Sequence, residues 1–250
     1  MLENRRKNFF EELKREFIHL ADALGLKEAK VEVKASPLKP EDAIGAVKRQ
    51  DYVLLKGKEK LLEATVMGCR GQAFTSAQGD FKGTLEEVLS FDLENDFQRA
   101  VYVAVLNAIA LYAGKTEKTV HCRNEGPELC AQKAADYFKG KYGNPRILMV
   151  GYQPALAEAL NNAGFSLTVL DLDSDNIGKN KNGVLIQNGR ENLSEHIASC
   201  DVIFATGSTI CNATIDNFYN TGKPLVFFGT TGAGAAALLG IERFCPESMA

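Results

Sequence analysis

The chain has 250 residues, of which 45% are hydrophobic and 24% charged, with a formal net charge of −3 at pH 7. This composition is typical of a globular protein and excludes a disordered or fibrous chain. No basic stripe suggests nucleic-acid binding. The longest apolar run, at 100–114, is too short to cross a bilayer. The N-terminus lacks the apolar stretch of a signal peptide, so we expect a cytoplasmic protein.

The first half of the sequence predicts an α+β unit. Apolar residues recur at helical spacing over 3–24, which predicts a long amphipathic helix. Three β-prone pieces follow and predict an antiparallel meander: KVEVKA (30–35), DYVLLKG (51–57) and EATVMGCRGQAFT (63–75). Two helical stretches come next, TLEEVLSF after Gly83 and a longer one with Asn95 as N-cap and Gly114 as the stop.

After the polar segment 115–125 the sequence alternates between apolar strands and amphipathic helices. The predicted strands are RILMVG (146–151), SLTVLDL (166–172), GVLIQ (183–187), DVIFATG (201–207) and PLVFFG (224–229). Continuous apolar strands of this kind indicate a parallel sheet that is covered on both faces. We therefore expect an α/β protein with an α+β domain over residues 1–114 and a Rossmann-like domain over residues 115–250.

Ligands of such sheets bind at the carboxyl ends of the strands, so the loops there are candidate sites. The first loop keeps Gly151, but Gln153 and Pro154 replace further glycines of the dinucleotide fingerprint, which disfavours a NAD-type site. Asp171 lies 20 residues after Gly151, where an acidic side chain commonly accepts ribose hydroxyls. The alternative for Asp171 is a solvated acidic loop.

The stretch ATGSTICNATID at 205–216 is unusually rich in hydroxyl and amide side chains. Gly207 permits a sharp turn off the strand, and Ser208 or Thr209 can cap the helix that follows. Asn212 and Thr214 then remain to face a cleft. This segment is the strongest local signal for a binding site.

The loop after the last predicted strand, GTTGAGAA, has the two glycines of a P-loop but lacks its Lys and its Ser or Thr. Nucleotide hydrolysis is therefore disfavoured, and Gly229, Thr230 and Thr231 remain as candidate ligand contacts. Their loop precedes a predicted helix, whose N-terminus suits a carboxylate or a phosphate.

The first half offers its own candidates for the binding site. Gly71, Gln72 and Thr75 follow or end a predicted strand and supply hydrogen-bonding groups. Asn107 is an amide inside an apolar helix, so it either supports a polar site or ties two backbone segments together. Arg99, two turns earlier, is a candidate anion contact.

The segment HCRNEGPELC brings His121, Cys122 and Cys130 close together in sequence, with Glu125 and Glu128 nearby. These residue types are ligands of zinc, but the spacing matches no zinc motif. We expect buried or capping roles, no metal site made by protein ligands alone, and reduced cysteines throughout.

Several segments together carry a family resemblance. DVIFATGSTICNATID, PLVFFGTTGAG, GCRGQAFT and RAVYVAVLNAIALY resemble a prokaryotic family of uncharacterised proteins named for "putative heavy-metal chelation". The resemblance implies an enolase-N-terminal-like domain joined to a Rossmann-like domain, with a site in the cleft between them. It also implies a glycine-proline-threonine pattern after the last strand, from which Gly229-Thr230-Thr231 departs.

Three functions are compatible with these residues. The chain is a small-molecule enzyme of siderophore, pterin or flavin-like metabolism performing condensation or hydrolysis, a non-catalytic binder of a metal chelate, or a relative of S-adenosylmethionine-dependent methyltransferases. No catalytic set can be assembled, so enzyme activity stays open, and no cofactor is identified. The expected partner is a small molecule or metal chelate, without nucleic acid or membrane, and a homo-oligomer stays open.

Overall fold

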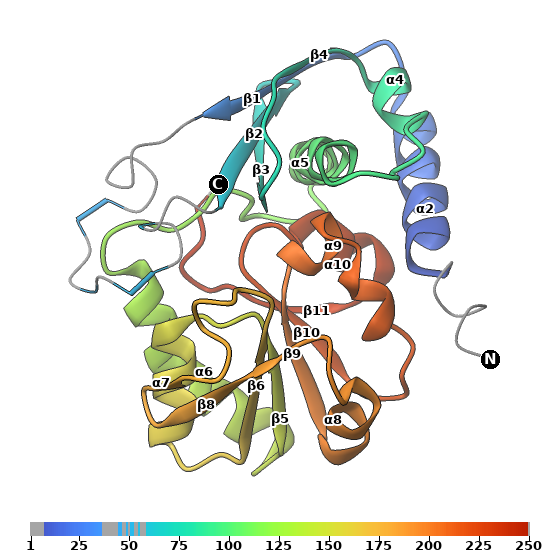
Figure 1. Ribbon diagram of the computed structural model, residues 1–250. Coiled ribbons are helices and arrows are strands. Elements are labelled where there is room, and N and C mark those ends of the chain that lie inside the picture. The colour runs from blue at the N-terminus through green and yellow to red at the C-terminus, as the bar shows by residue number, and fades with distance from the viewer. Residues whose placement is uncertain are drawn as a thin grey trace.

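The computed structural model describes residues 8–36, 45–46, 49, 51–52, 55 and 59–249. Over these residues the chain forms two separate β-sheets with helices packed on both (Figure 1). One sheet is antiparallel and the other contains mainly parallel strands, which confirms the expected α/β class. No helix in this described part of the chain is long and apolar enough to cross a bilayer.

The antiparallel sheet has the order β3-β2-β1-β4 and consists of β1 (Lys30–Ser36), β2 (Lys60–Val66), β3 (Cys69–Thr75) and β4 (Phe81–Thr84). The piece predicted over 63–75 is a hairpin, because Met67 and Gly68 adopt the positive φ angles of a two-residue turn, 50° and 77°. Because β4 pairs with β1, the sheet is not the simple meander expected. The strand predicted at 51–57 falls largely outside the described residues, and 51, 52 and 55 lie in no strand.

The described residues of the first half form the helices α2 (Asn8–Leu24), α4 (Leu85–Leu89) and α5 (Asp96–Tyr112). The first residues of the helix predicted over 3–24 lie outside the described part. Asn95 caps α5 as expected, its side chain accepting a hydrogen bond from the Gln98 amide. Residues 99–110 of α5 are all buried, because this helix lies between the antiparallel sheet and the helices α9 and α10 (Figure 1).

The second sheet has the order β11-β10-β9-β5-β6-β8-β7 and is parallel except for β7. Its strands are β5 (Ile147–Val150), β6 (Leu167–Asp171), β7 (Asn180–Lys181), β8 (Val184–Asn188), β9 (Val202–Thr206), β10 (Leu225–Phe228) and β11 (Glu242–Phe244). The chain runs outward from β5 to one edge and then returns to β9 on the other side of β5. Neighbouring loops therefore diverge between β5 and β9, which opens a crevice at their carboxyl ends.

The helices of the second half are α6 (Gly126–Tyr142), α7 (Pro154–Asn162), α8 (Leu193–Ser199), α9 (Ser208–Cys211) and α10 (Ala233–Leu239). Helix α6 was not predicted, because its buried positions are mostly small and its Gly-Pro start reads as a loop. The helix expected after Gly207 is only the short α9, with Gly207 itself as N-cap, and a 3₁₀ turn, η2 (Thr214–Asn217), follows it. Ala213 breaks the helix with a left-handed φ of 58°.

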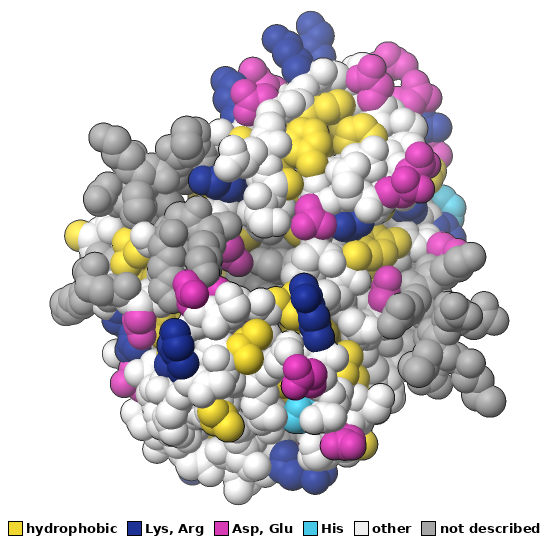
Figure 2. All heavy atoms as spheres, in the orientation of Figure 1, with side chains coloured by type: hydrophobic (Ala, Val, Ile, Leu, Met, Phe, Trp, Pro, Cys, Tyr) yellow, Lys and Arg dark blue, Asp and Glu magenta, His cyan; other side chains and the backbone are white. Residues whose placement is uncertain are grey.

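The strands of the parallel sheet divide their side chains between two hydrophobic clusters. Ile147 and Met149 of β5 face α6 and α7, whereas Leu148 and Val150 face the opposite side. The cluster on that opposite side also contains residues of α2, α5 and the antiparallel sheet. The two halves of the chain thus share one continuous core. Acidic and basic side chains are interspersed over the face in Figure 2, without a stripe of one sign.

Candidate functional site

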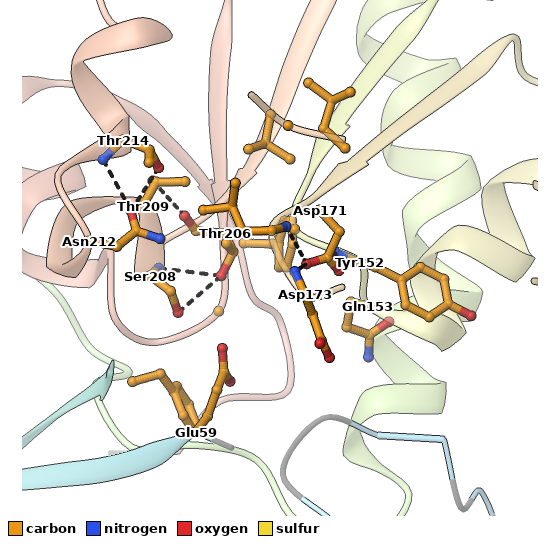
Figure 3. A pocket seen from close by; sticks show the side chains of 18 of the residues that line it. Glu59, Tyr152, Gln153, Asp171, Asp173, Thr206, Ser208, Thr209, Asn212 and Thr214 are labelled. Atoms are coloured by element: carbon orange, nitrogen blue, oxygen red, sulfur yellow. Dashed lines mark hydrogen bonds between the residues drawn. The ribbon is translucent and has the colours of Figure 1, made fainter. Parts of the chain in front are cut away.

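A cavity of about 490 Å³ lies at the carboxyl ends of β5, β6, β9 and β10. The strand-end loops at 150–154, 170–173, 206–218 and 228–229 contribute to one side of it. The first half and the segment before α6 contribute further lining residues, Tyr52, Glu59, Phe74, Ser76 and His121. In the close view of Figure 3, Glu59 points toward the loops that carry Ser208 and Asp173. The cavity is therefore enclosed by residues from both halves of the chain.

The β5 loop is shaped by one glycine and one helix cap. Gly151 has a φ of +89°, and a Cβ there would lie 2.6 Å from Cγ2 of Thr206, so only glycine allows the β5 and β9 loops to approach so closely. Gln153 is the N-cap of α7, and its Oε1 accepts a hydrogen bond of 2.5 Å from the Leu156 amide. Both residues hold the cavity wall in position.

Asp171 is the most heavily hydrogen-bonded side chain of the site. Its Oδ2 accepts from the Tyr152 amide at 3.1 Å and from Nδ2 of Asn176 at 3.0 Å. Its Oδ1 accepts from the amides of residues 172 and 173 at 2.6 and 2.9 Å. Four donors use the acceptor capacity of a carboxylate. Asp171 therefore ties the β5 loop to the β6 loop. A contact between Asp171 and ribose hydroxyls stays a prediction, and the four hydrogen bonds leave its carboxylate no free acceptor site for them.

The hydroxyl-rich β9 loop is organised by its own side chains. The Thr209 hydroxyl donates to the Thr206 carbonyl at 2.7 Å, and the Ser208 amide donates to Oγ1 of Thr206 at 3.3 Å. Oδ1 of Asn212 accepts from both the amide and the hydroxyl of Thr214, at 3.1 and 2.7 Å. Figure 3 shows this chain of contacts along one wall. Oγ of Ser208 accepts from Oγ1 of Thr206 at 3.4 Å, so the Ser208 hydroxyl proton and the Asn212 amide nitrogen remain available to a ligand.

Glu59 and His121 on the cavity wall have displaced pKa values. Burial, together with the nearby charges of Asp171 and Asp173, raises the pKa of Glu59 to about 7. Burial lowers the pKa of His121 to about 4. The His121 ring packs edge-on against Phe74 with centroids 5.1 Å apart, and its amide donates to Oε1 of Gln72 at 2.7 Å. At neutral pH the imidazole is uncharged and Glu59 is close to half-protonated.

The structure divides the residues predicted from sequence into two groups. Seven line the cavity: Gly151, Gln153, Asp171, Ser208, Thr209, Asn212 and Gly229. The other seven are not in its lining: Gly71, Gln72, Thr75, Asn107, Gly207, Thr230 and Thr231. Whether any of them contacts a ligand stays a prediction. The second group has packing and hydrogen-bonding roles that local patterns do not reveal.

Asn107 is the centre of that second group. Its Nδ2 donates to the Gln72 carbonyl at 2.8 Å and to the carbonyls of Thr231 and Thr230 at 3.1 and 3.2 Å. Its Oδ1 accepts from the Gly234 amide at 2.6 Å. The buried Asn107 thus joins β3 to the loop between β10 and α10, which is the second of the two roles expected for it.

Arg99, a candidate anion contact, has a similar anchoring role. Its guanidinium donates to the carbonyls of Cys211 and Leu93 at 2.7 and 2.6 Å and pairs with Asp96 at 2.5 Å. These contacts tie α5 to the end of α9 and use three of the five N–H donors of the guanidinium.

The cysteine segment before α6 does not keep its three candidate ligands together. His121 is part of the cavity wall, whereas Cys130 has the thiols of Cys122 and Cys245 as neighbours. Hydrogen bonding with Cys122, with burial, raises the pKa of the Cys130 thiol to about 12. In the described ranges no three His, Cys, Asp or Glu side chains are placed to hold a metal ion.

Sequence reasoning missed several residues of the cavity: Tyr52, Glu59, Phe74, His121 as a wall residue, Tyr152 and Asp173. Asp173 had a signal, since it lies in the acidic loop DLDSDN after a predicted strand. Glu59 had none, because it reaches the cavity only through the packing of the first half onto the second.

Comparison with known proteins gives a family match. The sequence model of the DUF364 family, described as "Putative heavy-metal chelation", matches residues 133–233. The resemblance inferred from the sequence is thereby confirmed. No curated protein sequence matches the chain.

Two solved structures of DUF364 proteins of unknown function are similar to this chain. The first, from Pyrococcus horikoshii, has a TM-score of 0.51 at 16% identity and covers 93% of this chain and 80% of its own. The second, from Desulfitobacterium hafniense, has a TM-score of 0.46 at 10% identity and covers 72% of this chain and 71% of its own. The first similarity supports a shared fold.

Proposed function

We propose that the chain, whose residues 133–233 match the DUF364 family model, binds a small organic molecule in the cavity between its two halves. The observation that carries the proposal is the position of the cavity at the carboxyl ends of four parallel strands, next to the point where the strand order reverses. Open α/β sheets bind their ligands there. Whether the bound molecule is also transformed depends on its identity.

The nature of the walls supports an organic ligand with a ring or an apolar body. Aromatic side chains, among them Phe74, Tyr152 and Phe228, alternate with the hydroxyl and amide groups of Ser208 and Asn212. Apolar walls with a few converging polar groups are typical of small-molecule sites. A heteroaromatic substrate of a condensation or hydrolysis, such as a pterin or flavin-like compound, is compatible with this surface.

A metal chelate is the second candidate, and the family description favours it. Since no metal ligand set occurs among the described residues, the metal would have to arrive with its own organic ligand. The third candidate, S-adenosylmethionine, has less support. Its ribose would need an acidic acceptor such as Asp171, which already has four donors.

We further infer that the two sheets correspond to two domains, over 1–114 and 115–250, of the enolase-N-terminal-like and Rossmann-like types. The strand order of the parallel sheet and its separation from the antiparallel sheet support this assignment. The shared core argues that neither domain is stable alone, because separation would expose apolar side chains of α5, α9 and α10.

A thermal-shift screen of pterins, flavins, adenosyl compounds and metal chelates tests the proposed function. A ligand of the cavity should raise the melting temperature of the native chain, and Ser208→Ala and Asn212→Ala should weaken that rise. Ser199→Ala, a change on the exposed end of α8, is the matched control and should leave the rise intact. Ligand-induced stabilisation that both site variants retain in full would show that the molecule binds elsewhere.

A further inference from the structure

The charged side chains that line the cavity have one sign among the residues that the structure describes. Among the described lining residues the charged groups are Glu59, Asp171 and Asp173, and no Lys or Arg belongs to that set. Asp171 accepts hydrogen bonds from four donors. An anionic ligand would therefore meet repulsion in a buried environment, where charges are poorly screened.

Four backbone donors of the strand-end loops that could offset this repulsion are already used. In the β5 loop, the amide of Tyr152 donates to Asp171 and that of Leu156 to the Gln153 side chain. In the β9 loop, the amides of Gly207 and Ser208 donate to the Phe228 carbonyl and to Thr206. A phosphate at a strand end needs such N–H groups free. These loops therefore suit an anion poorly.

Two groups on the opposite wall, by contrast, lack partners. The buried Nδ1 of His121 has no hydrogen-bond partner. Glu59 is half-buried, points into the cavity, and makes no hydrogen bond or ion pair with any other described residue. Unsatisfied buried polar groups are costly and call for a ligand or other partner. The ionised fraction of Glu59 is an acceptor only, and the neutral His121 ring has one donor and one acceptor nitrogen.

Resting on the proposed function, we propose that the cavity takes an organic cation, whose N–H donors face Glu59 and whose ring or apolar body packs against Phe74, Tyr152 and Phe228. A cation would pair with Glu59 and offset the repulsion between Glu59 and the carboxylates of the β6 loop. Aromatic walls add to its binding through their π faces. The Tyr152 ring already receives one cation, Lys181, whose Nζ lies 5.4 Å from the ring centroid. Amines, amidines and protonated aminoheterocycles share this chemistry.

A matched series of probes separates charge from shape. Benzamidinium, benzamide and benzoate have similar size and are cationic, neutral and anionic, and their binding to the full chain is measured by calorimetry at neutral pH. We expect benzamidinium to bind at least about tenfold more tightly than benzamide, since hydrogen bonds to charged groups are the stronger ones, and benzoate not to bind. Glu59→Gln should weaken benzamidinium binding by about tenfold, whereas Glu28→Gln, on an exposed turn before β1, should not.

Three outcomes overturn the inference: no binding of benzamidinium at millimolar concentration, equal binding of benzamide, or unchanged affinity in Glu59→Gln. None of them affects the broader proposal. A neutral or anionic compound whose stabilisation depends on Ser208 and Asn212 would leave the cavity as a ligand site and remove only its preference for cations.

Discussion

Replacing Glu59 by Gln should stabilise the protein at alkaline pH. In the folded chain, burial and the charges of Asp171 and Asp173 raise the Glu59 pKa to about 7, from a usual value of 4.5. The folded state therefore binds the Glu59 proton more tightly than the unfolded state does. Its contribution to stability is fully present below about pH 4.5 and is lost as the pH rises through about 7. Gln, which is neutral at every pH, avoids that loss.

The size of the effect follows from the two pKa values. The difference between about 7 and 4.5 corresponds to roughly 3 kcal/mol in the free energy of unfolding. Between pH 5 and pH 8 the native chain should lose most of this amount relative to Glu59→Gln. An organic cation bound beside Glu59 should reduce the loss, because it favours the ionised carboxyl.

Urea unfolding of both proteins at several pH values between 5 and 8 measures this difference directly. Glu28→Gln is the control, and its stability should follow that of the native chain, because Glu28 lies on an exposed turn. Parallel stability curves for the native chain and Glu59→Gln would refute the reasoning. They would mean that Glu59 is solvated, and that its position in the cavity imposes no cost on its charge.

Two further substitutions test the framework around the cavity. Asn107→Ala removes the side chain that bonds three carbonyls and one amide, so we expect the free energy of unfolding in urea to fall by about 3 kcal/mol or more. The control Asn162→Ala, at an exposed position, should change it little. A loss below about 1 kcal/mol in Asn107→Ala would contradict this role. Gly151→Ala and Gly164→Ala both place alanine at a positive φ, +89° and +82°, but only the first meets Thr206 at 2.6 Å. Gly151→Ala should be the less stable variant by at least about 1 kcal/mol. Equal stability of the two variants would show that the β9 loop moves aside for the added methyl group without an energetic cost.

The sequence by itself determined the class of the fold and one side of the cavity. Apolar runs such as 147–150 and 202–206 indicate buried parallel strands, because the pattern depends only on which side chains avoid water. Once those strands are parallel, their carboxyl ends share an edge, so the polar residues that follow them converge. Gly151, Asp171 and Ser208 were found in this way, and all three line the cavity.

Elements whose patterns are weak or whose partners are distant could not be predicted from the sequence. Helix α6 buries mainly small residues, and β4 pairs with β1 through contacts between segments some fifty residues apart. Asn107 presented the signal of a buried amide, but the sequence could not say whether it faces a ligand or the backbone. That choice depends on which loop packs against α5.

Only the tertiary structure decided the opposite side of the cavity and its chemistry. Glu59 comes from the residue before β2 and His121 from the segment before α6, and they line the same cavity as Asp171 only because the two halves share one core. The acceptor character of the site has the same origin. A pKa or an unsatisfied nitrogen depends on burial and on charges brought near in space, and neither is encoded by residues adjacent in the chain.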